Sequence, residues 1–246
     1  PFATADVISV PLSATFSSPP SSIAHQIKAQ FGYNFSSSTR LNASFSYGLQ
    51  LQNERFAPES TNPTAPIPPG AGTSFNGRVQ TLFGSATLTS RPLTGLDLKA
   101  SYTIDDRDNQ SPSRTFDALV NDTAEFFDVT TTLPYSFQHQ KANAEAGYSV
   151  MSGTRVVAGY TYERRTRTFS ATERNTENTF YAHANTQLFN EVFATLSFSH
   201  GVRTSSNYDG NANWLLRAQG EDVEAEVHYD APRTRNEYRG NVSWMP

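Results

Sequence analysis

The chain has 246 residues, a formal net charge of −4 and no cysteine. The absence of cysteine excludes disulfides, thiolate metal sites, covalently attached haem and thiol catalysis, and the lack of a basic excess argues against nucleic-acid binding. Mean hydropathy is −0.52 and 37% of the residues are hydrophobic, and no segment reaches the 18 or more apolar residues of a membrane-spanning helix. These values do not exclude transmembrane β-strands, because one face of such a strand is polar.

Alternation of apolar and polar residues predicts most of the secondary structure. The clearest segment is 41–52, in which every odd position is apolar and every even position is Asn, Ser, Gly or Gln. A period of two is typical of a strand with two unlike faces. The same pattern predicts eight further strands, near residues 23–35, 75–89, 96–105, 141–150, 156–163, 180–188, 192–198 and 238–244. Near 75–89, Val79 and Phe83 fall out of step with Leu82 and Leu88, so a β-bulge is predicted there.

The predicted strands are joined alternately by short and long connections. Short turns are expected near residues 36–39, 91–95, 151–154 and 189–191, and long polar loops near 53–73, 107–132, 164–176 and 203–235. Residues 1–22, rich in Ser and Pro, are predicted to form an extended loop. In an outer-membrane barrel the short turns would be periplasmic and the long loops external. Because nine strands is an odd number for a single-chain bacterial barrel and Pro1 begins no recognisable leader, residues 1–246 are interpreted as part of a longer chain.

The composition of the two faces favours a membrane barrel over a soluble β-sandwich, which also has one apolar face. On the clearest strands the interior of the apolar face carries no charge, whereas the other face includes Lys28, Asp97, Lys99 and Glu145. A cation that faces lipid at mid-depth costs roughly 2–4 kcal/mol. The sequence therefore predicts an all-β fold: an up-and-down antiparallel transmembrane β-barrel of the bacterial outer membrane, with about nine strands of a larger barrel in this chain.

Several short segments are similar to those of one family of outer-membrane proteins. They include Leu-Pro-Tyr-Ser-Phe-Gln-His-Gln-Lys at 133–141, Ala-Gly-Tyr at 146–148, Ala-Gly-Tyr-Thr-Tyr-Glu-Arg at 158–164, Thr-Glu-Asn-Thr at 176–179 and Asp-Asp-Arg-Asp-Asn at 105–109. Taken in order over most of residues 20–245, the set resembles the MtrB/PioB family of decahaem-associated outer-membrane proteins. No single segment is decisive, and the specificity comes from their order.

The resemblance implies a barrel of about 26 strands, at the upper end of the known range, that holds and insulates a periplasmic decahaem c-type cytochrome during electron transfer across the outer membrane. The partner would carry the haem, and this chain would bind no cofactor covalently. An outer-surface multihaem cytochrome and the outer-membrane lipid are the other partners that it implies. The residues expected to face the lumen and the partner are Gln26, Lys28, Gln30, Asn42, Ser44, Ser46, Gly48, Gln50, Lys99, Ser101, His139, Lys141, Asn143, Glu145, Gly147, Gly159, Thr161, Glu163, His183, Asn185 and Ser197. Small and amide side chains would let a rigid partner approach closely and form hydrogen bonds.

The histidines and the acidic residues have simpler interpretations than metal or haem sites. The chain has five histidines that could in principle be haem ligands: His25, His139, His183, His200 and His228. No Cys-x-x-Cys-His motif accompanies them. For His139 and His183, a position lining the lumen is favoured. A second group has part of the spacing of a calcium loop, and comprises Asp105, Asp106, Asp108, Asn109 and Asp117. Ser111 replaces the required glycine, so a solvated acidic rim is favoured and no metal site is predicted.

Four arginines, Arg164, Arg165, Arg167 and Arg174, surround one predicted hairpin tip. They are candidates for contact with an outer-surface cytochrome or with lipopolysaccharide phosphates, although a mixed-charge solvated hairpin is favoured. No catalytic triad, Walker loop or dinucleotide motif occurs in a supporting context, so no enzymatic activity is expected. Two other functions stay open: a solute-conducting porin or receptor barrel, and a soluble adhesin-like sheet.

Overall fold

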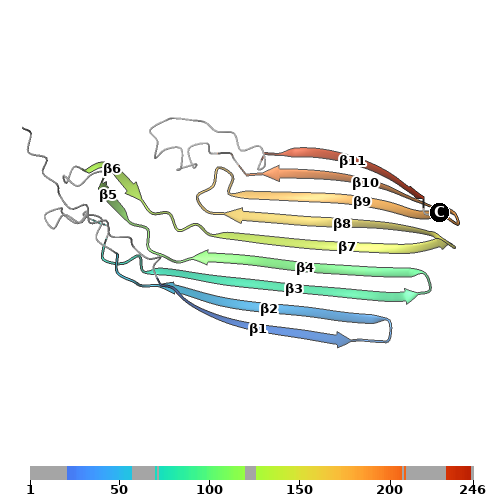
Figure 1. The fold of residues 1–246 in the computed structure, drawn as a ribbon, viewed down its shortest axis with the longest axis horizontal. Helices are drawn as coiled ribbons and strands as arrows, with labels where there is room; N and C mark the ends of the chain where they lie inside the picture. The colour runs from blue at the N-terminus through green and yellow to red at the C-terminus, as the bar shows by residue number, and fades with distance from the viewer. Residues whose placement is uncertain are drawn as a thin grey trace, which may run out of the picture.

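The computed structural model describes residues 21–56, 70, 72–119, 126–206, 208 and 231–244. Nine long strands form one antiparallel sheet, and each pairs with the next long strand along the chain (Figure 1). They are β1 (Ile23–Asn34), β2 (Thr39–Gln52), β3 (Gly77–Leu93), β4 (Leu96–Asn109), β7 (Phe137–Met151), β8 (Thr154–Arg167), β9 (Arg174–Phe189), β10 (Val192–Ser205) and β11 (Arg233–Trp244). The all-β, up-and-down prediction is confirmed. Among the described residues, no helix is long and apolar enough to cross a membrane.

Tight turns join the strands at one end of the sheet. Leu93 pairs with Leu96 and Met151 with Thr154, so two of these turns have only two residues between the paired positions. Gly95 and Gly153 occupy them with φ of 80° and 75°. Glycine adopts this left-handed conformation without steric cost, which explains its place in both turns.

The region near 107–132 is not the simple polar loop that the sequence predicts. β4 extends to Asn109, and β5 (Thr115–Leu119) pairs with β6 (Phe126–Thr131) in a separate two-stranded sheet. This hairpin lies at the loop end of the main sheet, between β4 and β7 (Figure 1). The connection predicted near 164–176 is also shorter, since β8 and β9 extend into it. Residues 1–20 and most of the loops near 53–73 and 203–235 lie outside the described residues.

The predicted bulge near residues 75–89 is wrong. From Gly77 to Ser90, β3 keeps a continuous register with β2, and its irregularity with β4 lies beside the turn, between Ser90 and Leu93. The blurred pattern has another cause, because Val79 and Phe83 lie on the polar face of the sheet. From the sequence pattern alone, a β-bulge cannot be distinguished from a regular strand with apolar residues on its polar face.

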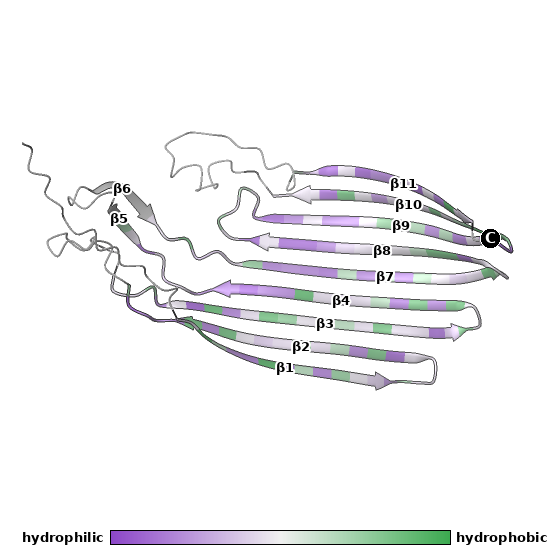
Figure 2. Cartoon of the chain, viewed as in Figure 1, coloured by the Kyte–Doolittle hydropathy of each residue, from purple (hydrophilic) through white to green (hydrophobic). Residues whose placement is uncertain are grey.

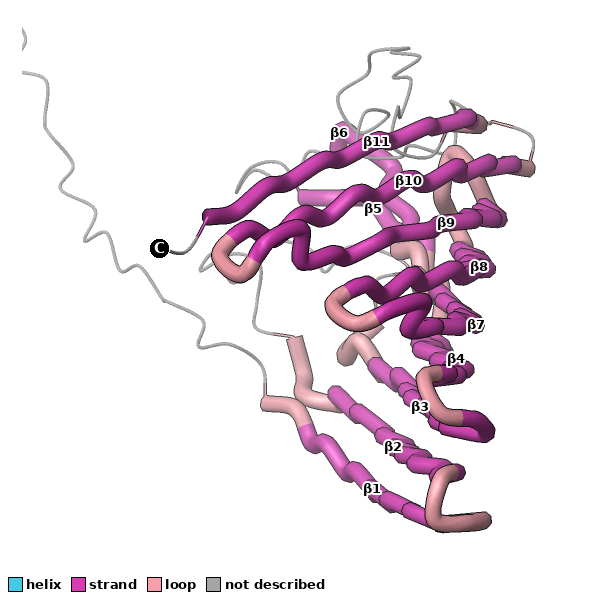
Figure 3. Tube along the Cα trace, turned by 90° about the vertical axis from the view of Figure 1, so that its right-hand side faces the viewer, coloured by secondary structure: helices cyan, strands magenta, loops and turns pink. Residues whose placement is uncertain are grey.

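The sheet is curved and open. Figure 3 shows its strands following an arc. Within the described residues, β1 pairs with β2 alone and β11 with β10 alone. A transmembrane sheet must have every edge paired, so these nine strands are part of a transmembrane barrel.

Large apolar side chains cover one face of the sheet instead of filling an interior. Among the described residues only Val157 and Ala171 are buried hydrophobic residues, whereas Ile27 is 69% exposed and Leu196 is 67% exposed. The register aligns the apolar positions of neighbouring strands, as in the pairing of Leu88 with Ala100. A soluble protein rarely exposes so large an apolar surface, so this face is the one in contact with lipid.

The apolar band on this face runs obliquely across the strands. On β2 it extends to Leu51 towards the loop end, but on β10 it ends at Phe198. Phe198 stands in the same register row as Thr39 of β2, twelve residues from Leu51 along that strand. A band that is level with the membrane crosses tilted strands obliquely in this way, and closed barrels tilt their strands by about 35–45°.

The loop ends of the strands extend beyond the band. On β9 the outward-facing residues from Phe180 onward belong to the apolar band, whereas Arg174–Thr179 is polar. Figure 2 likewise shows the loop ends of β8 and β9 as predominantly hydrophilic. Six residues of a strand span about 20 Å along its axis, so at this end the sheet extends through the headgroup layer and beyond it as a raised polar rim.

The assignment of the two faces predicts opposite effects for neighbouring residues of β4. Ala100 lies in the middle of the apolar band and Ser101 on the polar face. In the full-length protein, Ala100→Arg is expected to lower the free energy of unfolding from lipid vesicles by about 2–4 kcal/mol. Ser101→Arg should change it by less than about 1 kcal/mol. Equal losses in urea titrations of the two variants would contradict the assignment.

Candidate functional site: the polar face

The polar face brings together every residue that the sequence predicts to face the partner. One register row contains Gln30, Ser44, Lys141 and Glu163, and the remaining predicted residues occupy neighbouring rows of the same face. In a transmembrane barrel the polar face lines the lumen. Contact of these residues with a partner stays a prediction.

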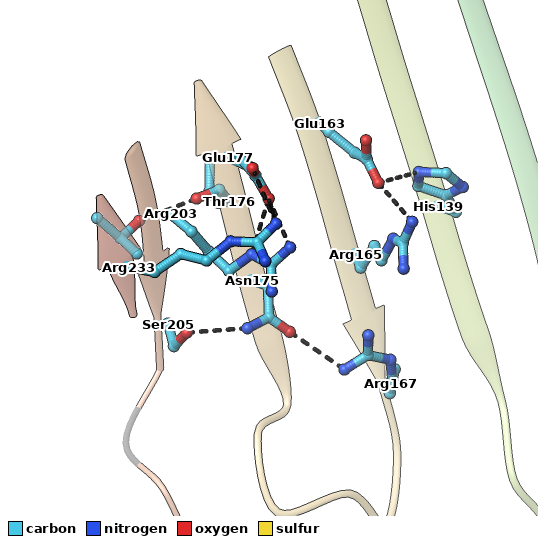
Figure 4. A network of polar contacts seen from close by, with 11 residues as sticks. His139, Glu163, Arg165, Arg167, Asn175, Thr176, Glu177, Arg203, Ser205 and Arg233 are labelled. Atoms are coloured by element: carbon cyan, nitrogen blue, oxygen red, sulfur yellow. Dashed lines mark hydrogen bonds and ion pairs between the residues drawn. The ribbon is translucent and has the colours of Figure 1, made fainter. Parts of the chain in front are cut away.

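Within the described residues, most carboxylates on this face pair with basic side chains of the same sheet, some on the same strand and others on another strand. Four ion-pair groups are present: Asp97 with Arg91 and Arg155; Glu163 with His139 and Arg165; Glu177 with Arg203 and Arg233; and Glu237 with Arg235 and Arg239. Figure 4 shows the two central groups at the loop ends of β8 and β9. The paired side chains are partly exposed, so each pair contributes little to stability, but the pairing reduces the net acidity of the surface.

Several contacts on the polar face reach across an intervening strand. The Tyr181 hydroxyl of β9 donates to Glu145 Oε2 of β7 at 2.9 Å and accepts from Asn143 Nδ2 at 2.9 Å. Arg155 of β8 similarly reaches Asp97 of β4. Side chains converge on the concave side of a curved sheet, so these contacts identify the polar face as the concave one.

The glycines of this face are covered by neighbouring side chains. An added Cβ at Gly159 would lie 2.4 Å from the Tyr181 ring, and one at Gly147 would lie 2.5 Å from the Arg155 guanidinium. At Gly48 the contact would be 2.5 Å from Thr81 Oγ1. These glycines therefore give room to neighbouring side chains of this chain. That they also allow a partner to approach closely stays a prediction.

The lysines of the polar face, unlike most of its arginines, have no carboxylate partner among the described residues. All three lysines of the chain, Lys28, Lys99 and Lys141, lie on the polar face and are exposed. None of them forms an ion pair within the described residues. Arg40 and Arg107 of the same face also have no carboxylate partner, but their guanidinium groups donate to Asn42 and to the Tyr135 carbonyl. The lysine ammonium groups therefore stay available to an anionic group outside the sheet.

The structure separates the histidines and leaves no metal cluster among the described residues. His139 and His183 lie on the polar face, where His139 Nε2 is 3.0 Å from Glu163 Oε1. His25 and His200 lie on the opposite face, and His228 is outside the described residues.

The two other predicted clusters are split in the same way. Asp105 faces the polar side, whereas Asp106 and Asp108 face the other side, where Asp106 Oδ2 accepts from Gln138 Nε2 at 2.6 Å. Of the four arginines, Arg165 and Arg167 are on the polar face and the other two are on the lipid-facing side. Alternation within a strand sends successive residues to opposite faces, so nearness in sequence does not make these sites.

Several polar-face residues that form hydrogen bonds or ion pairs were not predicted from the sequence. Tyr181 stands between Phe180 and Ala182 and resembles part of the apolar pattern, although its odd position matches His183 and Asn185. Because β11 begins earlier than predicted, Arg233 and Arg235 were assigned to a loop and Glu237 was left out of the predicted strand. Strict counting of alternate positions would have placed Tyr181 correctly.

Comparison with known proteins identifies the family. The model of the MtrB/PioB family, outer-membrane β-barrel porins, matches residues 3–246. The chain belongs to this family. The match confirms the resemblance to this family that the short sequence segments indicate. It also confirms the β-barrel fold and the location in the bacterial outer membrane. Comparison with curated proteins gives no match.

Solved structures with a similar fold include OmpT of Vibrio cholerae. The outer-membrane-expressed protein is 13% identical, with a TM-score of 0.46, over 89% of this chain and 56% of that one. The trimer form folded in vitro has the same identity and coverage, with a TM-score of 0.45. This MtrB/PioB chain thus spans about 56% of the length of these proteins.

The packing of Tyr181 over Gly159 predicts a specific cost. Gly159→Ala would place a methyl group against the rigid ring and force Tyr181 away from Asn143 and Glu145. We expect a loss of about 1–3 kcal/mol in the free energy of unfolding of the full-length protein. In a Tyr181→Ala background the same change should cost less than about 0.5 kcal/mol. Gly240→Ala, which has no atom near the added methyl, is the control, and an equal loss there would contradict the packing argument.

Proposed function

We propose that this chain is part of an outer-membrane sheath that holds and insulates a multihaem c-type cytochrome for electron transfer across the membrane. Membership of the MtrB/PioB family supports the proposal. The role is structural and not catalytic: the barrel would keep the haems of the partner in line and out of lipid. This chain would bind no haem covalently, since it contains no cysteine.

The observation that carries this proposal is the character of the concave face. Four of its carboxylates, Asp97, Glu163, Glu177 and Glu237, are paired with arginine of the same sheet. The central rows between them are rich in Ser, Thr, Asn and Gln. Hydroxyl and amide groups can donate and accept hydrogen bonds with many partners. Such a surface suits extended contact with a folded protein, because, among the described residues, most of its carboxylates already have a cation beside them and only Asp105 and Glu145 would be desolvated without one.

The raised rim supports the same role. On β9 the strand continues past the apolar band by about 20 Å, so the walls of the barrel extend beyond the bilayer. A sheath for a long protein partner would gain contact area from such an extension. An outer-surface cytochrome would then meet the rim.

A second candidate is a porin that conducts solutes. The description of the family as outer-membrane β-barrel porins favours it. A lumen lined with paired charges and hydroxyl groups would also be hydrated and passable if no protein filled it.

Isolation of the full-length protein separates the two functions. From native outer membranes in mild detergent, the sheath should carry c-type haem in a fixed ratio to the barrel, detected by haem staining and by redox-difference absorbance. A porin would instead be haem-free and would form open pores in planar bilayers. Haem-free protein with stable conductance would overturn the sheath proposal.

The three lysines predict an electrostatic contribution to the partner contact. Replacing Lys28, Lys99 and Lys141 with Gln is expected to weaken retention of the cytochrome roughly tenfold at low salt. The difference should shrink as ionic strength rises, since salt screens exposed charges. The matched triple Lys→Arg variant keeps the charge and should retain the partner as wild type does. Equal retention by the Gln and Arg variants would show that these cations do not contact the partner.

A further inference from the structure

A hollow lies on the lipid-facing side of the sheet, just beyond the apolar band. It is formed by β8, β9 and β10 at their loop ends and has a volume of about 290 Å³. Two cations and five hydroxyl-bearing residues line it: Arg164, Arg174, Tyr162, Thr176, Thr204, Ser205 and Ser206. No carboxylate is among them. Because one water molecule occupies about 30 Å³, the hollow is large enough for a group much bigger than water.

Arg164 gives the hollow an unsatisfied hydrogen-bond donor. Its Nε is the one buried side-chain polar atom of the described residues that has no hydrogen-bond partner. Leaving a charged donor buried and unpaired is costly. Neither guanidinium is engaged with a carboxylate in the described residues, in contrast to Arg165 and Arg203 on the other face.

The hollow stands at the depth where lipid headgroups lie. Tyr162 is the last residue of the apolar band on β8. Two positions earlier, towards the membrane centre, the ring of Tyr160 packs against that of Phe180, with 4.8 Å between the ring centroids. Aromatic residues concentrate at the membrane–water interface. Arg164 follows Tyr162 on the same face, so its guanidinium is at the level of phosphate groups.

We propose that Arg164 and Arg174 form a binding site for the phosphate group of a membrane lipid. Guanidinium groups bind phosphate oxygens through paired, charge-assisted hydrogen bonds. The hydroxyl groups of Thr176 and Tyr162 stand beside them in the same hollow. The site lies outside the lumen, so it is independent of whether the barrel encloses a cytochrome.

Two lipid sources share this chemistry, a phosphorylated glycolipid of the outer leaflet and a phospholipid. Binding to the delipidated full-length protein in detergent micelles distinguishes them, with three probes: bisphosphorylated lipid A, dephosphorylated lipid A and phosphatidylglycerol. We expect phosphorylated lipid A to bind at least about tenfold more tightly than its dephosphorylated form. Equal binding of the three probes would overturn the proposal. Tight binding of phosphatidylglycerol as well would support a site for phosphate in general.

Matched variants test the residues. Arg164→Gln/Arg174→Gln should lose at least about tenfold in affinity for the phosphorylated probe. Arg165→Gln/Arg167→Gln removes the same charge from the same hairpin on the opposite face, and it should stay within about twofold of wild type. If the first variant folds poorly, Arg164→Lys/Arg174→Lys is the alternative that keeps the charge. A second test uses the wild-type protein, on which inorganic phosphate should compete with lipid A for binding. Unchanged affinity in the Gln variant, or no competition by phosphate, would overturn the site.

Discussion

Every backbone N–H and C=O within the hydrocarbon must find its partner inside the protein, and this requirement governs the rest of the structure. The antiparallel ladder satisfies it for each strand with two neighbours, but β1 and β11 have one neighbour each among the described residues. Their outer edges would be unpaired in lipid, so in a closed barrel each of them must pair with another strand. The same ladder fixes the register, and a slip of one residue would exchange Ala100 with Ser101 at the lipid surface.

Fixed register in turn decides where charge is tolerated. On the lipid-facing side, charged residues occur only beyond the apolar band, as Asp106 and Arg164 do. On the concave side they occur along the strands and pair with one another. Convergence of side chains on that side brings groups from alternate strands into contact, as Arg155 and Asp97 show. Curvature, alternation and charge pairing are therefore consequences of one arrangement, and the lysines are conspicuous because they do not take part in the pairing.

Much of this fold could be predicted from the sequence, because a strand between lipid and water has a strict alternation that survives in segments such as 41–52. The β5–β6 hairpin was missed, since strands of five and six residues carry too few alternations to be distinguished from a loop. Phe83 misled the prediction because a large lumen tolerates an aromatic residue on its polar face. The contacts of Tyr181 could not be predicted either: they join residues 36 and 38 positions apart in sequence and depend on the curvature of the sheet.

The distribution of charge also bears on how such a barrel would hold a partner. A surface on which most carboxylates already have a cation beside them gives a docking protein limited electrostatic gain, so retention would depend mainly on the area of contact and on shape. A large barrel provides that area, and the raised rim adds to it. The lysines then add a salt-dependent contribution to retention and help to orient the partner, since exposed charges also influence encounter and register. On the lipid side the converse holds: a buried arginine nitrogen without a partner has a strong need for an anion, and membrane lipid phosphates are the anions that lie at that depth.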